Sequence, residues 1–554
     1  MRPLPLLTVL VLAGPVAAGL LGTILPALGH LPAAGLSGWS AAPMRAALGW
    51  PGMPQAAALS LGTGMAATLG ALAVATLLLA GWHGTAAARV VERLLSPLLA
   101  VPHAAAALGL AFLIAPSGWI ARLIAWPLGV ERPPDLLIVQ DPWGIALTLG
   151  LIAKEVPFLL LMMLAALPQA DPDRRLRVAR ALGQGRVAGW LKAVFPAVYA
   201  QVRLPVLVVL AYGMTTVDVA AILGPNTPAT LSVQVTRWMV DPDLSARAVG
   251  AAGAVVQLGL VGFALGLWWI GERLVAAWGR RWAASGRGLP ERAARGAGLG
   301  LGAVSALAVL GGLAGLAVWS VAGRWRFPDP WPEAVTTRSW DRFGPEMLDV
   351  AGGTLALAAL ATGLSLALVI GCLEAEERHG LSAGSRAAWL LYLPLLVPQI
   401  AFLPGLLLLP GAAGAGGWGA VLAAHVVFVL PYVFLSLSGP WRAWDPRLAR
   451  VARGLGAGRD RVLWRLRLPM LLAPVLTAAA VGMAVSVGQY LPTLLIGGGR
   501  VATLTTEAVA LASGGDRRAI GVWGIGQALA AFAPFALALA LPALVWRDRR
   551  GLRG

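Results

Sequence analysis

Long apolar stretches separated by short polar segments fill most of this sequence, and they restrict the folds open to it. A helix that spans about 30 Å of hydrocarbon needs about 20 residues, and the sequence contains twelve apolar runs of roughly that length. They cover approximately residues 5–29, 57–81, 94–115, 143–167, 199–223, 247–271, 297–321, 349–371, 387–410, 418–438, 471–496 and 522–546. Because the runs are continuously apolar instead of alternating, they predict membrane-spanning helices and not a β-barrel.

A basic segment that contains two glycines occurs twice in the chain. Residues 177–196 (RVARALGQGRVAGWLKAVFP) align without gaps with residues 450–469 (RVARGLGAGRDRVLWRLRLP), at a shift of 450 − 177 = 273. A constant register over so great a separation indicates an internal duplication. Each half then holds an even number of spans, so both halves enter the membrane in the same orientation. We therefore predict an all-α polytopic membrane protein of about 12 transmembrane helices, built as two parallel six-helix halves.

Both copies keep the same spacing of a small residue, a glycine and a proline. These residues are Ala179, Gly183 and Pro196 in the first copy, and Ala452, Gly456 and Pro469 in the second. The pattern resembles the cytoplasmic EAA loop of permease subunits in binding-protein-dependent ABC importers, a family with a MetI-like permease core. The resemblance implies that each loop forms a coupling helix that docks on a separate ATPase. The motif's leading glutamate is replaced by Arg177 and Arg450, so the contact made by that acid is not carried over.

The glycines of the two loops also have a meaning of their own. Gly183, Gly185, Gly456 and Gly458 each disfavour a helix by about 1 kcal/mol relative to alanine. They predict that a short helix ends there and that the chain turns back toward the bilayer. The arginines around them fit two partners, an acidic protein surface or anionic lipid, which attracts each basic residue by about 1 kcal/mol.

The duplication divides the chain into five parts. Residues 1–56 are expected to form an N-terminal transmembrane helix and an outside loop, and residues 57–271 the first permease core. Residues 272–348 would supply a cytoplasmic linker, a transmembrane helix and an outside loop, residues 349–546 the second permease core, and residues 547–554 a cytoplasmic tail.

The formal charge of +18 is distributed as in a membrane protein, so it does not indicate nucleic-acid binding. With the N-terminus inside the cell, most of the 43 lysines and arginines fall in cytoplasmic loops, the linker and the tails. The positive-inside rule therefore predicts that both termini are cytoplasmic. Together with the family resemblance, this indicates a multi-pass protein of the bacterial inner membrane.

Besides Arg203 near the start of its run, three charged residues fall inside apolar runs of the first half, where charge is costly and needs a partner or water. They are Lys154, Glu155 and Asp218. Neighbours on a helix point in different directions, so Lys154 and Glu155 are expected to have separate partners, with Asp218 a candidate for Lys154. Two interpretations stay open, namely a buried ion pair between helices and side chains that line a translocation path.

The sequence contains no energy source or catalytic machinery of its own. No G-x-x-x-x-G-K-[ST] phosphate loop occurs, and the only lysines are Lys154 and Lys192. The five histidines show no metal-ligand spacing with one another, and no nucleophile–base–acid arrangement stands out. We expect a transport subunit that is not an enzyme, with no metal and no cofactor in this chain, so that ATP would be bound by a partner subunit.

The favoured interpretation is the fused transmembrane subunit of an ABC importer. Its implied partners are an ATPase dimer on the cytoplasmic side, an extracytoplasmic substrate-binding protein and the lipid bilayer. The first alternative is an ion-coupled secondary transporter of six plus six helices, and the second is a membrane-embedded enzyme. The substrate stays open: the fused layout resembles thiamine-type and ferric-iron-type permeases, with polyamine and phosphonate importers close behind.

Overall fold

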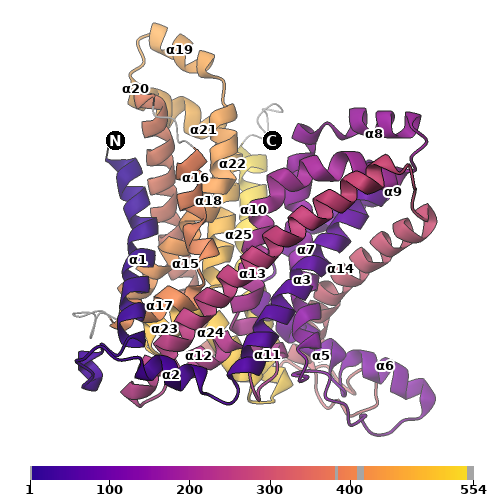
Figure 1. Ribbon diagram of the computed structural model, residues 1–554, viewed down its shortest axis with the longest axis vertical. Helices are drawn as coiled ribbons and strands as arrows, with labels where there is room; N and C mark the ends of the chain where they lie inside the picture. Colours follow the sequence, from indigo (N-terminus) through magenta and orange to yellow (C-terminus); the bar gives the residue numbers. More distant parts are fainter. Residues whose placement is uncertain (1–2, 381–384, 409–416, 546–554) are drawn as a thin grey trace.

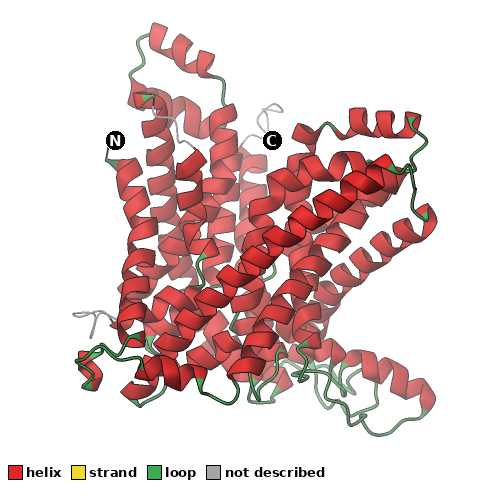
Figure 2. Ribbon diagram, in the orientation of Figure 1, coloured by secondary structure: helices red, strands yellow, loops and turns green. Residues whose placement is uncertain are grey.

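The computed structural model describes residues 3–545 except 381–384 and 409–416, so the predicted tail at 547–554 lies outside it. Every regular element in the described part is a helix (Figure 2). Ten helices are long and apolar enough to cross a membrane, or twelve if two bent pairs each count as one span. The predicted all-α polytopic fold is confirmed.

The helices follow the same order in both halves, except that α2 and α6 have no counterpart in the described part of the second half. The first half contains α1 (Leu4–Ala27), α2 (Ala42–Leu48), α3 (Met53–Trp82), α4 (Ala86–Ala100), α5 (His103–Ile114), α6 (Trp119–Leu128), α7 (Ile145–Ala170), α8 (Pro172–Ala181), α9 (Arg186–Gly189), η2 (Trp190–Val194), α10 (Phe195–Thr215), α11 (Asp218–Leu223), α12 (Leu231–Met239) and α13 (Leu244–Ala284). The second half contains α14 (Glu291–Val321), α15 (Arg338–His379), α16 (Ser385–Leu396), α17 (Gln399–Leu408), α18 (Trp418–Ala443), α19 (Pro446–Gly454), α20 (Arg459–Val462), η3 (Leu463–Arg467), α21 (Leu468–Met470), α22 (Leu472–Val487), α23 (Leu491–Gly497), α24 (Leu504–Ala512) and α25 (Arg517–Val545). A short 3-10 turn, η1 (Pro32–Ala34), follows α1.

The first helix of each half packs against the other half. Helix α1 lies along α17, and α14 lies along α5 and α3. At both crossings two glycines face each other. A Cβ atom added to Gly405 would lie 1.8 Å from the carbonyl oxygen of Gly19, and a Cβ atom added to Gly109 would lie 2.8 Å from the carbonyl oxygen of Gly312. Only glycine allows backbones to approach this closely, as is usual where helices pack in lipid. The two halves are therefore interlocked by α1 and α14.

Three predicted spans are interrupted. The run 94–115 divides into α4 and α5 at Pro102, because the residue before a proline, here Val101, is pushed into extended geometry. The run 387–410 bends by 91° between α16 and α17, and the run 471–496 divides into α22 and α23. The sequence reading missed these breaks because each interrupted run stays apolar throughout.

The fifth span is also shorter than predicted, and this moves one candidate residue. Helix α10 ends at Thr215, and Thr216 is extended. Asp218 was expected within the span, but it is instead the first residue of the short helix α11. Its carboxylate accepts a hydrogen bond of 2.8 Å from the Thr216 hydroxyl, which belongs to the two-residue break.

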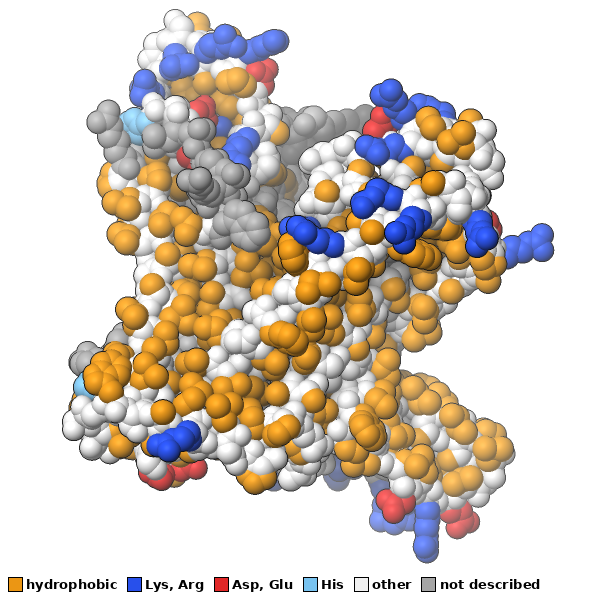
Figure 3. Space-filling view, in the orientation of Figure 1, with side chains coloured by type: hydrophobic (Ala, Val, Ile, Leu, Met, Phe, Trp, Pro, Cys, Tyr) orange, Lys and Arg blue, Asp and Glu red, His pale blue; other side chains and the backbone are white. Residues whose placement is uncertain are grey.

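Both repeated loops lie at one end of the molecule. Figure 1 shows α8, α9, α19 and α20 at this end, together with the start of α1 and the connection between α13 and α14. Many lysine and arginine side chains gather there, whereas the middle of the visible face is mainly hydrophobic (Figure 3). Helices α13 and α14 extend through most of 272–296, so that only residues 285–290 are non-helical between them.

Candidate coupling loops and buried charges

The first repeated loop turns at Gly183. Helix α7 ends at Ala170, and Asp171 adopts a left-handed conformation just before α8 begins at Pro172. After α8, Gly183 has φ of +74°, which is strained for any residue with a side chain. The chain then enters α9, and Gly185 is the last residue before it. The predicted ending of a short helix at a glycine is confirmed here.

The second loop repeats this turn. Asp445 caps the start of α19 by accepting a 2.8 Å hydrogen bond from the Arg447 amide. Gly456 then has φ of +85°, and Gly458 directly precedes α20. The positive φ at this glycine agrees with the turn predicted from the sequence.

The shared frame extends to an irregular feature beyond each turn. A single π-helical turn follows α9 at Trp190–Val194 and α20 at Leu463–Arg467, again at a shift of 273. Such turns widen a helix locally and are frequent at functional sites. The prolines of the motif come next, Pro196 as the second residue of α10 and Pro469 as the second residue of α21.

The two short helices before the turns differ in how closely they pack. Ala179 and Leu176 of α8 are buried, and α8 lies against η2. Helix α19 has no buried residue, and the equivalent alanine, Ala452, is half-buried. Arg177 and Arg450, which replace the motif glutamate, are both exposed.

The connection between the halves binds the first loop. The Glu291 carboxylate, at the start of α14, accepts hydrogen bonds from the backbone amides of Val187 (2.9 Å) and Ala188 (3.1 Å). Helix N-termini attract a carboxylate because their first amides have no helical partner. Nearby, Gln184 donates to the Gly286 carbonyl at 3.0 Å, and the Lys192 ammonium donates to the Gln184 side chain at 2.9 Å.

The second loop is held by ion pairs instead. Arg378, near the end of α15, pairs with Asp460 of α20 at 2.8 Å and with Glu374 at 2.6 Å. Arg467 of η3 is buried, and it pairs with Glu374 at 3.3 Å and with Glu377. In the first half the position of Arg467 is occupied by Val194, which is fully buried among apolar side chains.

Lys154 is not paired with Asp218. Its ammonium group donates to the carbonyls of Leu98 (2.9 Å) and Leu99 (3.2 Å), in the last turn of α4. The last carbonyls of a helix lack intrahelical donors and attract a cation. The predicted candidate pair is therefore wrong, and Lys154 instead closes the end of α4.

Glu155 and Asp218 have partners of their own. Glu155 contacts the His103 ring nitrogen Nε2 at 3.2 Å, which fits the expectation that it would not share a partner with Lys154. Asp218 is instead bonded to the Thr216 hydroxyl at 2.8 Å. Each carboxylate thus has a partner other than Lys154.

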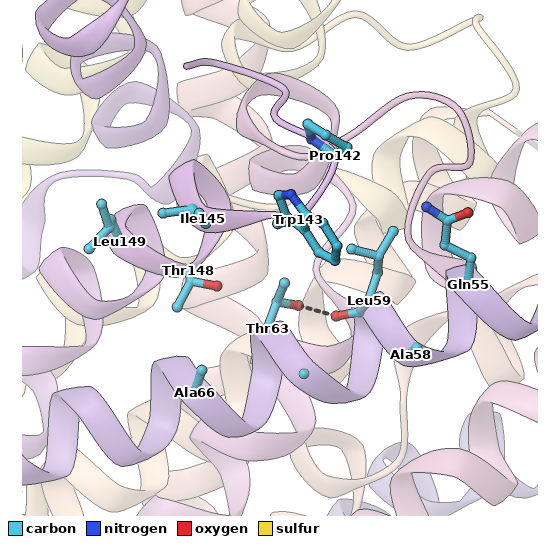
Figure 4. A pocket seen from close by; sticks show the side chains of 11 residues that line it. Gln55, Ala58, Leu59, Thr63, Ala66, Pro142, Trp143, Ile145, Thr148 and Leu149 are labelled. Carbon is cyan, nitrogen blue, oxygen red and sulfur yellow. Dashed lines mark hydrogen bonds between the residues drawn. The ribbon is translucent and has the colours of Figure 1, made fainter. Parts of the chain in front are cut away.

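A cavity of about 440 Å³ lies away from these residues (Figure 4). It is bounded by α3, the start of α7 and the residues just before α7, with Trp143 and Thr63 on its wall. The Thr63 hydroxyl is already satisfied by the Leu59 carbonyl at 2.7 Å. With no charged side chain in its lining, this cavity contributes nothing to the charged sites described above.

Sequence reasoning missed the residues that hold the loops. Glu291 is remote from its loop in sequence and has no counterpart in a repeat, so only the folded chain reveals its role. Arg467 did carry a signal, since it stands where the first copy has the apolar Val194.

Comparison with known proteins agrees with the arrangement of the helices. The family described as "Binding-protein-dependent transport system inner membrane component" matches residues 363–546. The chain is 31% identical over 509 residues to the inner membrane ABC transporter permease protein YnjC of Escherichia coli, covering 91% of each chain. It is 26% identical over 137 residues to the spermidine/putrescine transport system permease protein PotC of Haemophilus influenzae, covering 24% of this chain and 53% of PotC.

A further relative is the molybdenum transport system permease protein ModB of Mycobacterium tuberculosis. It is 29% identical over 194 residues, which cover 33% of this chain and 70% of ModB. No match was found among solved structures.

The contact between Glu291 and the first loop can be tested by removing the carboxylate. Hydrogen bonds to a charged group contribute about 1.5–3 kcal/mol, and because Glu291 is half-buried, we expect Glu291→Ala to cost an amount at the lower end of this range. The purified protein should melt at a lower temperature, and Glu291→Gln, which keeps one acceptor oxygen, should fall between. Glu131→Ala removes an exposed carboxylate elsewhere and serves as the control. An unchanged melting temperature for Glu291→Ala would refute the contact.

Proposed function

This chain belongs to the family of inner membrane permeases of binding-protein-dependent ABC transport, and we propose that it is the complete, fused translocation unit of one importer. Its two halves would form the substrate path between them and work by alternating access. The observation that carries the proposal is the pair of equivalent loops. Both have the same order of short helices and the same left-handed glycine turn, and they lie at the same end of the molecule (Figure 1).

We infer that the two loops are coupling elements for a separate ATPase. Each presents a short helix, a left-handed glycine and a π-helical turn. The first π-helical turn continues directly into α10, whereas the second is followed by α21 and a bend of 76° before α22. A push on such a loop would be passed along α10 or α22 into the membrane. The substrate-binding protein would then dock at the opposite end, near α6 and α24.

The end that bears the loops is proposed to be cytoplasmic. The basic side chains gathered there support this orientation through the positive-inside rule (Figure 3). The N-terminus and the connection at 285–290 would then face the same compartment as the ATPase.

We also infer that Glu155 and Asp218 line the path. Lys154 is engaged by carbonyls of α4, so neither carboxylate has it as a hydrogen-bonded partner. Two carboxylates in the path would favour a positively charged substrate over an oxyanion by charge. Of the relatives, this agrees with the polyamine permease and not with the molybdenum permease.

The orientation has a direct test. A phosphatase reporter, which is active only outside the cytoplasm, is fused after residue 290 and, in a second protein, after residue 130 between α6 and α7. We expect activity only from the second fusion. Activity only from the first would place both loops in the wrong compartment and end the coupling proposal.

The coupling role is tested at the two left-handed glycines. Gly183→Val and Gly456→Val force a β-branched residue into a conformation that costs roughly 1–3 kcal/mol, so the turn should reorganise. We expect substrate uptake in proteoliposomes to fall at least tenfold, while ATP hydrolysis continues and no longer responds to loaded binding protein. Gly129→Val is the matched control, because Gly129 also has positive φ (+66°) but caps the end of α6, away from both loops (Figure 1).

Two results would contradict that coupling role. One is normal uptake by both glycine variants. The other is uptake by the parent chain without any ATPase, driven by an ion gradient, which would establish a secondary transporter instead.

The path is tested with Asp218→Asn and Lys154→Met. The first should abolish uptake of cationic probes, spermidine and thiamine, with little change in melting temperature. The second leaves the Leu98 and Leu99 carbonyls without a donor, at about 1–3 kcal/mol, and should lower the melting temperature. Because the two residues have different partners, their effects on stability should add to within about 0.5 kcal/mol. Uptake of molybdate but of neither cation by the parent complex would contradict the inference.

A further inference from the structure

The helices before the two turns expose matching apolar side chains. Val178 and Leu182 on the first loop are 57% and 74% exposed, and Val451 and Leu455 on the second are 63% and 84% exposed. Each pair is separated by four residues and so lies on one face at the end of its helix. Large apolar side chains that stay exposed at equivalent places in both halves indicate a surface that another molecule covers.

Arginines surround these apolar pairs in the same register. Both helices carry three at a spacing of three residues, and all six are exposed. They are Arg174, Arg177 and Arg180 in α8, and Arg447, Arg450 and Arg453 in α19. Within the part of the chain that the structure describes, none of the six forms an ion pair. Two of them, Arg177 and Arg450, stand where the family motif has a glutamate.

We propose that the ATPase partner of this chain has docking grooves with an apolar base and a rim of aspartates and glutamates. This rests on the proposed coupling function and adds the chemistry of the partner surface. Val178 and Leu182, or Val451 and Leu455, fill the base of a groove, and the three arginines of that helix pair with the acidic rim. An ATPase whose rim is basic is rejected, since like charges brought together at an interface cost several kcal/mol.

The position of the loops favours a protein partner over the lipid surface. No residue of α19 is buried, and the helix projects beyond the ends of the membrane-crossing helices (Figure 1). A helix that binds lipid has to lie in the plane of the membrane surface with its apolar face inward. The repetition of both the apolar pair and the three arginines fits a partner that offers the same surface twice.

The test reverses the charge at the motif position in both loops. Permease carrying Arg177→Glu and Arg450→Glu is placed in nanodiscs of neutral phosphatidylcholine, and the affinity of the ATPase that co-purifies with the parent chain is measured at several salt concentrations. We expect binding at least tenfold weaker than for the parent, with a reduced salt dependence. Arg45→Glu with Arg132→Glu, two exposed arginines outside the loops, should bind as the parent does.

A reciprocal change makes the result specific. Replacing acidic residues on the groove rim of the ATPase by arginine should restore binding to the Glu variant and weaken binding to the parent. Unchanged binding of the Glu variant would overturn the acidic-rim proposal and leave the coupling function standing. If no ATPase binds the parent, the coupling function itself fails. Unchanged ATPase binding, together with lost attachment to vesicles that contain phosphatidylglycerol, would assign the arginines to lipid and overturn the proposal.

Discussion

The two glycine crossings between α1 and α17, and between α14 and α5, hold the rest of the structure in place. In lipid no hydrophobic force drives helices together, so close van der Waals packing and backbone proximity have to supply the attraction. The approach of Gly405 to Gly19, and of Gly312 to Gly109, provides it at both crossings. Because α14 begins with Glu291, its position against α5 also sets where that carboxylate meets the first loop. The packing of α14 against α5 thus sets the position of the hydrogen bonds between Glu291 and the first loop.

The two halves keep the same backbone turns, but the side chains that hold those turns in place differ. The turn glycines, the π-helical turns and the prolines keep one register, since they set the direction of the backbone. The residues that secure the two loops differ: Glu291 and the connection serve the first, and Arg467 with its glutamates serves the second. Removing one partner of a buried ion pair leaves a charge without compensation. For this reason Arg467 and Glu374 could only change together, whereas Val194 is free of that requirement.

How far the sequence predicts this protein depends on whether a feature is local. Twelve apolar runs, the 273-residue register and the turn at Gly183 are properties of short segments, so composition and spacing suffice to find them. The partner of Lys154 is not local: it is the end of α4, whose position is set by the break at Pro102. The same holds for Asp218, since nothing in an apolar run announces that α10 ends at Thr215.

An importer built from one duplicated chain has two loops that need not respond alike. The first is tied to a helix that belongs to the other half, so a force on it reaches both halves at once. The second is tied by Arg378 and Arg467 to α15 of its own half, and α19 has no fully buried residue. The charges inside the membrane are unequal too, since Glu155 and Asp218 both come from the first half. If two identical ATPase subunits dock on these loops, they will exert equal forces on two loops that are attached to different helices. The two halves will then move by different amounts. If Asp218 lines the path, this asymmetry reaches the path too, because α10 connects the first loop directly to the break before Asp218.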